Sequence, residues 1–187
     1  MTWDLREFVC VIDDALPPAM CDDIVRQFDS TVSHASRVQV DGQLSFDELE
    51  IDGRPEWITH QVALERAKDH FYRVYQARCP GRFPATHGFE SFRIKRYRPE
   101  AKDEFRNHVD GYDLVSSRRF LVCFWYLNDV ETGGQTTFPE LGLEVQPRRG
   151  RLIMFPPFWM FEHAGLPPVS NPKYIISTYL LFDHKSQ

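Results

Sequence analysis

The stretch Arg119–Asn128 reads RFLVCFWYLN and is apolar on both of its alternating faces. This pattern is typical of a strand that is buried on both sides, so other elements must cover both faces of its sheet. Turn signals such as Gly133-Gly134 and Gly150 separate it from shorter strand candidates. These further strands are predicted at 88–98, 105–110, 143–145, 151–155, 163–166 and 173–182. Many short strands in one part of a chain favour a double-sheet jelly roll.

The N-terminal part has a different pattern. Residues 8–12 predict an opening strand, and a helix is expected from Pro18 to about Phe28, because proline is tolerated in a first helical turn. Residues 55–78 place apolar side chains at helical spacing and are predicted to cover one face of the sheet. Residues 30–54 are polar without a sustained period, which predicts a long loop with at most a short strand near 38–40.

The predicted fold class is mainly β with N-terminal helices (α+β). In this arrangement a double-stranded β-helix (jelly roll) core at about 88–183 is backed by a helical support region at about 14–80. A chain of 187 residues favours one domain, because two halves would each have a thin core. We therefore expect residues 1–187 to form a single domain.

Composition and charge argue against some classes of binding partner. A formal net charge of −5 argues against a general nucleic-acid binder, which normally shows a basic surface. No apolar run approaches the roughly 18 to 20 residues needed to cross a bilayer, and the N-terminus lacks a secretion-signal pattern. The four cysteines form no CxxC pair, which favours reduced thiols. We expect a cytoplasmic protein with neither nucleic-acid nor membrane partners, and the oligomeric state stays open.

His108 and Asp110 are candidate metal ligands. Two residues apart on a strand, their side chains leave the same face. A third ligand would complete the two-histidine, one-carboxylate face of non-haem iron(II) oxygenases. His163 is the natural third ligand because it lies in an apolar, strand-rich stretch. On spacing alone the pair is no better than chance, and His163 has the alternative of a buried histidine bonded to a backbone carbonyl.

Five ordered blocks resemble the prolyl 4-hydroxylase branch of the 2-oxoglutarate/Fe(II) dioxygenases. They read FRNHVD, YLNDVETGGQTTFP, VQPRRGRLIMFP, HAGLPPV and PKYIISTYL. The opening VIDDALPPAMCDDI is also similar to the start of that family. The resemblance covers most of the chain and is weakest over residues 30–87. It implies that His108, Asp110 and His163 bind Fe(II).

The resemblance also implies 2-oxoglutarate as cosubstrate, O2 as oxidant and ascorbate as a candidate reductant. Lys173, ten residues after His163, is expected to meet the far carboxylate of 2-oxoglutarate, which is costly to bury without a charge. Ser177 and Tyr179 share a strand face with Lys173 and are further candidates for this pocket. Tyr97 resembles the tyrosine that contacts 2-oxoglutarate in the family, and a purely structural tyrosine is the alternative.

The implied reaction hydroxylates an unactivated C–H bond, most simply that of a prolyl residue in a peptide or protein, and yields succinate and CO2. No catalytic acid, base or nucleophile is expected beyond the metal centre. Residues 30–54 and the Gly111–Arg119 turn are candidates for a loop that closes over the peptide. Arg118 and Arg119 are candidates to attract an acidic peptide, and Trp159 to form part of the pocket wall.

Three alternatives stay open from the sequence. Within the enzyme class, the substrate could be a free amino acid or another small molecule. A deep pocket with a second ammonium/carboxylate clamp would favour that reading, and an open groove would favour a peptide. From a different class, the chain could be a non-catalytic jelly-roll module that binds a metal or ligand. A third possibility is a zinc hydrolase on a similar barrel.

Overall fold

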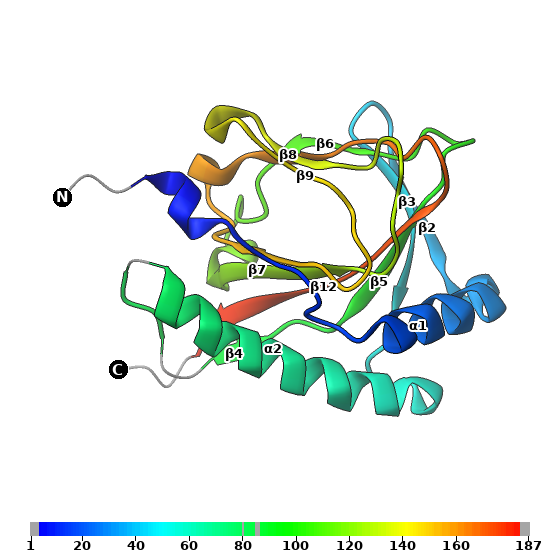
Figure 1. Cartoon of the computed structure of the whole chain (residues 1–187), viewed down its shortest axis with the longest axis horizontal. Coiled ribbons are helices and arrows are strands. Elements are labelled where there is room, and N and C mark those ends of the chain that lie inside the picture. Colours follow the sequence, from blue (N-terminus) through cyan, green and yellow to red (C-terminus); the bar gives the residue numbers. More distant parts are fainter. Residues whose placement is uncertain (1–3, 80, 85–86, 184–187) are drawn as a thin grey trace.

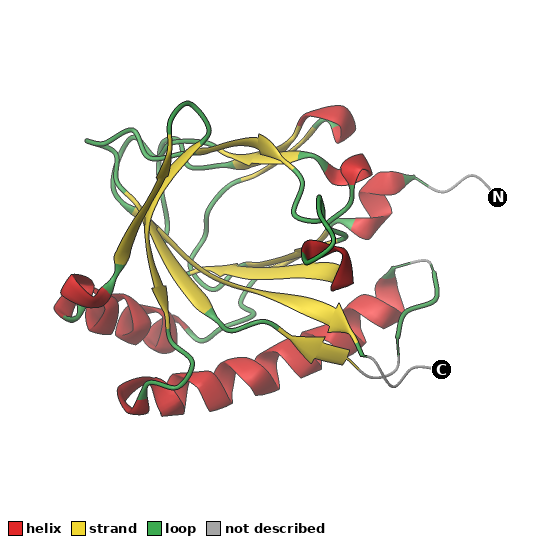
Figure 2. Cartoon of the chain, turned by 180° about the vertical axis from the view of Figure 1, so that it is seen from behind, coloured by secondary structure: helices red, strands yellow, loops and turns green. Residues whose placement is uncertain are grey.

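The computed structural model describes residues 4–79, 81–84 and 87–183. They form a curled antiparallel sheet with two α-helices on its outer face (Figures 1 and 2). The helices are α1 (Pro18–Ser30) and α2 (Ile58–Arg78). The strands are β1 (Cys10–Ile12), β2 (Ser36–Val40), β3 (Leu44–Glu50), β4 (His87–Phe89), β5 (Arg93–Tyr97), β6 (Phe105–His108), β7 (Arg119–Tyr126), β8 (Thr136–Phe138), β9 (Leu143–Val145), β10 (Leu152–Phe155), β11 (His163–Gly165) and β12 (Lys173–Phe182). Short 3-10 helices are η1 (Leu5–Phe8), η2 (Val32–His34), η3 (Pro55–Trp57), η4 (Ser116–Arg118), η5 (Pro139–Leu141) and η6 (Trp159–Phe161).

The sheet runs in the order β1-β10-β7-β12-β5-β3-β6-β11-β8-β9, with β2 added to β3 and β4 added to β12. Because the sheet curls back on itself, β6, β8 and β9 lie across the interior from β7 and β12 (Figure 1). Strand β12 lies between β7 on one side and β4 and β5 on the other. The predicted class, mainly β with helices ahead of the main strands, is confirmed.

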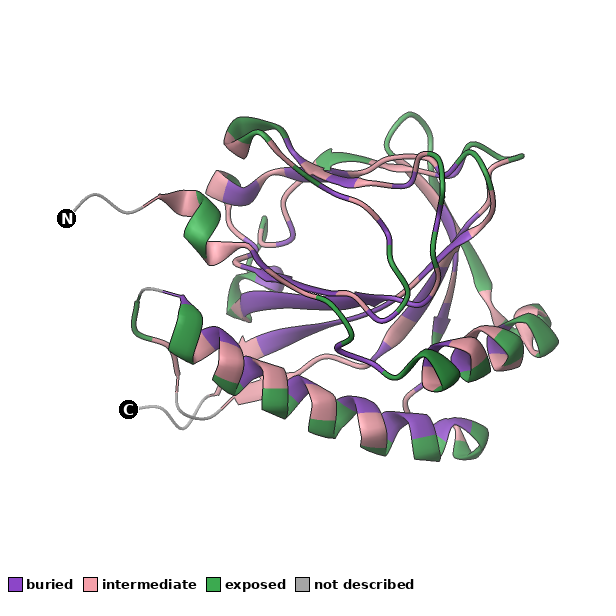
Figure 3. Ribbon diagram, viewed as in Figure 1, coloured by how far each residue is buried: buried purple, intermediate pink, exposed green. Residues whose placement is uncertain are grey.

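Strand β7 explains how the fold is layered. Every residue from Phe120 to Tyr126 is at most 6% exposed, which confirms the strand predicted to be buried on both faces. Its side chains alternate between two cores. One face, which includes Trp125, packs with residues of α1 and α2, and the other, which includes Phe124, points into the barrel. Figure 3 shows buried residues along β7 and along one side of α2.

The long helix predicted at 55–78 is confirmed, since η3 leads directly into α2. Its buried face includes Leu64, Tyr72 and Tyr75, which join the core between helix and sheet. Neither α-helix in the described part of the chain is long and apolar enough to span a membrane. The four cysteines are buried and free.

The expected long loop at 30–54 is wrong. Residues 36–50 form the hairpin β2–β3, in which Val40 pairs with Leu44, and β3 continues the sheet beside β5. These strands were not predicted because their outer face carries ion pairs instead of apolar side chains. Asp47 on β3 pairs with Arg96 on β5 at 2.9 Å, and Arg37 on β2 pairs with Asp103. Of this region, only the short strand near 38–40 was expected.

Glycines close the turn after β7. Gly133 and Gly134 have φ angles of 78° and 75°, as the predicted turn requires. A Cβ on Gly133 would lie 2.6 Å from the carbonyl oxygen of Pro167, so the turn also needs glycine for space. The short strand β8 that follows was not predicted.

Candidate metal centre

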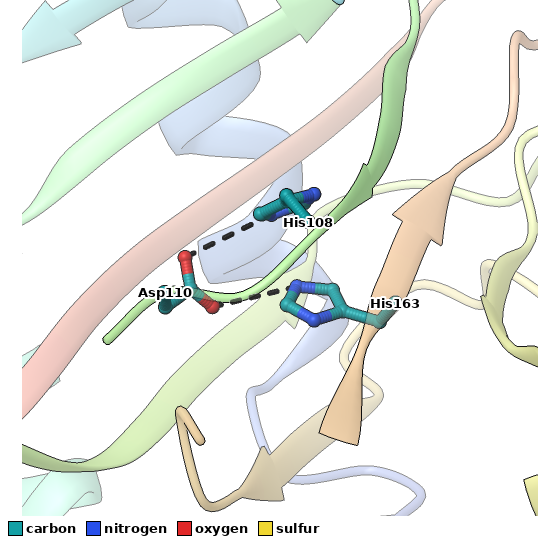
Figure 4. A group of neighbouring side chains, drawn as sticks. All are labelled: His108, Asp110 and His163. Carbon is teal, nitrogen blue, oxygen red and sulfur yellow. Dashed lines mark ion pairs between the residues drawn. The ribbon is translucent and has the colours of Figure 1, made fainter. Parts of the chain in front are cut away.

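The sheet register brings the three predicted ligands together. His108 ends β6, Asp110 follows two residues later, and His163 begins β11 directly opposite His108. Their side chains converge in Figure 4. Asp110 Oδ1 lies 3.8 Å from His108 Nε2, and Oδ2 lies 3.4 Å from His163 Nε2. One candidate ligand atom from each residue lies within 4.8 Å of the others.

Backbone carbonyls fix both imidazole rings. Nδ1 of His108 donates to the carbonyl of Arg106 at 2.7 Å, and Nδ1 of His163 donates to that of Phe161 at 3.1 Å. A carbonyl oxygen only accepts, so the proton must sit on Nδ1. The lone pair of each Nε2 is then free on the side of Asp110. Histidines that bind metals are commonly held in this way.

The protonation states suit a divalent cation. Burial, with a further effect of His163, lowers the pKa of His108 to about 4, and burial also lowers the pKa of His163. Burial alone would raise the pKa of Asp110, but the two histidines and a hydrogen bond from Tyr179 outweigh it and the pKa is lowered. Near neutral pH the site therefore offers two neutral imidazoles and one carboxylate, the forms that bind metal.

Asp110 is held by neighbouring strands. The hydroxyl of Tyr179 donates to Oδ1 at 2.7 Å, and Nη1 of Arg119 donates to the Asp110 backbone carbonyl at 2.9 Å. The Arg119 guanidinium stacks 3.9 Å from the Tyr179 ring and forms an ion pair of 2.6 Å with Glu90. Arg119, expected to attract a peptide, is thus committed to contacts inside the protein.

A cavity of about 50 Å³ opens beside the three ligands. A single water needs roughly 10 to 15 Å³ on this measure, so the cavity has room for a small ligand. Its lining includes all four residues predicted for 2-oxoglutarate: Lys173, Tyr97, Ser177 and Tyr179. Two predicted substrate residues lie elsewhere: Arg118 is exposed on η4, and Trp159 is 77% exposed, so it does not form the cavity wall.

Lys173 is 2% exposed, and its ammonium donates to the carbonyls of Gly134 at 3.0 Å and Leu166 at 3.2 Å. It also lies 4.4 Å from the centre of the Tyr97 ring. Among residues 4–79, 81–84 and 87–183, no carboxylate forms an ion pair with it. Burial accordingly lowers its pKa to about 7. A buried ammonium without a counter-charge fits an anionic ligand.

Among the residues that line the cavity, three with polar side chains were not predicted from the sequence: Lys95, Tyr126 and Thr136. Lys95 shares a face of the predicted 88–98 strand with Tyr97, and this alternation was the available signal. Tyr126 follows by the same alternation within β7, and its hydroxyl lies 2.6 Å from Thr136 Oγ1. Thr136 belongs to a strand of three residues, too short to show a clear alternation in the sequence.

The donor set fits Fe(II). Two imidazole nitrogens and one carboxylate from one side leave other coordination positions open, which suits non-haem iron oxygenases. His108, Asp110 and His163 are the residues that could hold the ion, and Lys173 could hold the anionic end of a bound organic acid. The arrangement could therefore bind a metal and a small dicarboxylate in one cavity.

Comparisons with known proteins agree with this geometry. Residues 92–181 match the sequence profile of the 2OG-Fe(II) oxygenase superfamily. "Probable prolyl 4-hydroxylase 9" of Arabidopsis thaliana is 36% identical over 92 residues, which cover 38% of this chain and 31% of that protein. Prolyl 4-hydroxylase 13 of the same plant is 27% identical over 128 residues, covering 53% and 45%. The chain thus spans less than half the length of these relatives.

Solved structures show the same fold. A viral collagen prolyl hydroxylase from Paramecium bursaria Chlorella virus-1, in complex with 2OG, has a TM-score of 0.71 at 22% identity, covering 92% of this chain and 95% of the viral one. A prolyl hydroxylase from Trichoplax adhaerens, in complex with a hypoxia inducible factor peptide, has a TM-score of 0.76 at 18% identity, covering 94% and 84%. The matched segment of the sequence is thus similar to 2OG-Fe(II) oxygenases and prolyl 4-hydroxylases, and the fold of the chain is that of solved prolyl hydroxylases.

Proposed function

We propose that this chain is a 2-oxoglutarate- and Fe(II)-dependent dioxygenase that hydroxylates a prolyl residue in a peptide or protein. One observation carries the proposal: Lys173, a buried lysine without an acidic partner among the described residues, lines the same cavity as the His108, Asp110 and His163 triad. A metal site alone fits many activities. A metal site beside a buried cation fits an enzyme that binds metal and an organic acid together.

Different residues would bind the metal and the cosubstrate. His108, Asp110 and His163 would hold Fe(II) from one side, with the rings kept in the ligating tautomer by backbone carbonyls. Lys173 would pair with the far carboxylate of 2-oxoglutarate. When bound, the iron with 2-oxoglutarate and O2 supplies the oxidising chemistry that turns C–H into C–OH and yields succinate and CO2. The protein positions the substrate and limits access of water.

Tyr179 and the apolar walls serve that positioning. Tyr179 keeps the Asp110 carboxylate oriented toward the histidines and is therefore a positioning residue. Phe124 and Val122 line the cavity and reduce the number of waters that can enter. Tyr97 packs its ring against the Lys173 ammonium, which favours the charged lysine that a carboxylate requires. Ser177 adds a hydroxyl to the same wall.

A peptide substrate is supported by the rim of the site. The loop after Asp110 carries exposed apolar side chains: Tyr112 at 74%, Leu114 at 88% and Val115 at 82%. The backbone amide of Gly111 donates to the carbonyl of Pro157 at 2.8 Å, which joins this loop to the segment that carries the exposed Trp159. Exposed apolar groups beside a cavity mark a surface for a partner chain. The prolyl hydroxylase names of the relatives point in the same direction.

A free amino acid is the second candidate, favoured by one observation. Lys95 and Glu48 form an ammonium/carboxylate pair at 3.8 Å, and Lys95 lines the cavity. A pair of this kind suits the two charged groups of an amino acid. We also propose a cytoplasmic location, supported by the four buried free cysteines, and ascorbate as a reductant in the assay.

The test has two steps. Fe(II) and 2-oxoglutarate are first titrated into the protein without O2, and a metal-to-cosubstrate absorption band is expected. Air is then admitted with a panel of proline-containing peptides or with L-proline, and succinate and hydroxyproline are measured. Absence of both the band and succinate would refute the oxygenase. Succinate with hydroxylation of L-proline, and of no peptide, would favour the second candidate.

A further inference from the structure

Lys95 is a buried cation that the metal centre and the cosubstrate do not account for. It lies on β5 with 8% exposure and lines the cavity beside the metal triad. Its ammonium lies 3.8 Å from Glu48 Oε2, too long for a good hydrogen bond, and 5.1 Å from the centre of the Phe46 ring. Within the described ranges, no oxygen accepts a hydrogen bond from it.

Two other buried lysines show how unusual this is. Lys68 on α2 is 3% exposed, and its ammonium donates a hydrogen bond to Asp69. Lys173 donates to two carbonyls. A buried ammonium whose donors are unfilled costs free energy that a well-placed acceptor would recover. Because Lys95 lines the cavity, that acceptor can come from a bound molecule.

The charges around Lys95 come from several elements. Burial lowers the pKa of Lys95. Among the neighbouring charges, Glu48 on β3 and Asp110 after β6 favour its charged form, whereas Arg93 on β5 and Arg119 on β7 disfavour it. Both arginines are already bound to Glu90, at 3.0 and 2.6 Å. In the part of the chain that the structure describes, the ion-pair partner of Lys95 is the distant Glu48 alone. Of Lys95, Arg93 and Arg119, Lys95 is therefore the one best placed to receive a new anion.

Lys95 is also separated from the expected cosubstrate anchor. On β12, Ile175 stands opposite Lys95, and Lys173 stands opposite Tyr97. The two lysines are thus offset by two residues along neighbouring strands, or about 7 Å. The Lys173 ammonium donates to the Gly134 and Leu166 carbonyls, whereas the Lys95 ammonium lies near Glu48. One cavity therefore holds two distinct cationic positions.

We propose that Lys95 is a specificity-determining residue that receives a carboxylate of the substrate, next to the C–H bond presented to the metal triad. The inference rests on the proposed function and adds a substrate class: the preferred substrate is acidic near its reacting carbon. The carboxylate has two sources, an acidic side chain beside the proline of a peptide or the α-carboxylate of a free amino acid.

The test compares binding by protein loaded with Fe(II) and 2-oxoglutarate in the absence of O2, so no turnover is needed. One arm uses two proline peptides that differ only by Glu or Gln beside the proline. The other arm uses L-proline and L-prolinamide. Calorimetry is expected to show that the carboxylate member of one pair binds at least about tenfold more tightly. The arm in which this preference appears identifies the source.

Variants assign the preference to Lys95. Lys95→Met keeps the side-chain length and removes a buried charge, so the fold is expected to persist. It should remove the preference, whereas Lys95→Arg should retain part of it. Lys68→Met is the matched control, because it removes a buried lysine outside the cavity and should leave the preference intact. A melting curve for each variant checks that it is folded.

Three outcomes would overturn the inference. Wild-type protein shows no carboxylate preference in either arm, the preference survives in Lys95→Met, or Lys95→Met weakens 2-oxoglutarate binding as strongly as the loss of Lys173 does. The last result would make Lys95 a cosubstrate residue. Failure of the proposed function would be seen separately, as the absence of succinate when air is admitted, whatever the binding preference.

Discussion

The hydroxyl of Tyr179 donates a 2.7 Å hydrogen bond to Oδ1 of Asp110 inside the barrel. The bond fixes the rotation of the carboxylate and leaves Oδ2 facing His163 at 3.4 Å. Each of the three candidate ligands is thus held by a second group, since the two histidines donate to backbone carbonyls. Such supporting contacts set the geometry and basicity of metal ligands.

Tyr179→Phe is expected to weaken Fe(II) binding by roughly 10- to 100-fold, because the carboxylate loses the contact that orients it. Anaerobic metal titration measures the change. Tyr174→Phe is the control, since Tyr174 lies on the same strand but bonds Asp29 on the helix side. An equal loss of affinity in both variants would show a general effect of losing a hydroxyl from β12.

Metal removal separates the oxygenase from a zinc hydrolase. Treatment with a chelator should abolish succinate formation, Fe(II) should restore it, and Zn(II) should not. His108→Ala should abolish turnover even with excess Fe(II), since a site with two remaining ligands binds the ion weakly. Activity with Zn(II) in the absence of O2 would contradict the proposed function.

Lys173→Met should raise the KM for 2-oxoglutarate by about 10- to 100-fold, the range expected for losing a charge-assisted hydrogen bond. Without 2-oxoglutarate the same variant should be at least as stable as wild type, because it removes a buried ammonium that lacks a counter-charge. Steady-state kinetics and thermal unfolding measure the two effects. An unchanged KM would remove Lys173 from its proposed role.

The affinity for 2-oxoglutarate should depend on pH through Lys173. Burial lowers the pKa of this lysine from 10.5 to about 7, and a bound carboxylate should raise it again. Binding therefore takes up a proton above pH 7, and affinity should be highest below pH 7 and fall by up to about tenfold per pH unit above it. Calorimetry between pH 6 and 9 tests the slope. Lys173→Met should bind weakly and with little pH dependence over that range.

The lowered pKa of Lys173 also makes the stability of the folded protein depend on pH. Because the folded-state pKa lies below the unfolded value, the unfolded chain binds more protons between about pH 7 and 10.5. The full free-energy cost of burying the charged Lys173 ammonium therefore applies below pH 7, and this cost decreases as pH rises through this window. The free energy of unfolding of Lys173→Met should therefore exceed that of wild type by the largest amount at or below pH 7.

Some features were predictable because they are local. The double-sided apolar pattern of β7 and the helical spacing of α2 each follow from residues close in sequence. The shared direction of His108 and Asp110 follows from strand alternation. The closeness of His163 does not follow from local pattern, because it depends on the pairing of β6 with β11. Its apolar, strand-rich stretch made His163 a candidate, and the family resemblance made it the expected third ligand.

Other features depend on topology and could not be found locally. The hairpin β2–β3 has few apolar side chains on its outer face, and ion pairs such as Asp47 with Arg96 replace them, so the segment resembled a loop. Nothing in the sequence singled out Lys95, because a lysine on a strand usually points to solvent. Only the curl of the sheet places its face of β5 inside the barrel beside the metal triad.

The turn at Gly150 gives a stability prediction independent of the site. Gly150 has φ 81°, and its carbonyl accepts hydrogen bonds from the amides of Ala15 and Leu16. A Cβ there would lie 2.5 Å from the Leu16 carbonyl oxygen.

Gly150→Ala therefore combines a left-handed backbone, which costs about 1 to 2 kcal/mol, with a backbone clash. Gly142→Ala is the matched control, because Gly142 has φ 60° with no neighbouring atom within 4 Å of the added Cβ. Denaturant unfolding should show a larger loss for Gly150→Ala, and equal losses would show that the chain ahead of α1 shifts to relieve the clash.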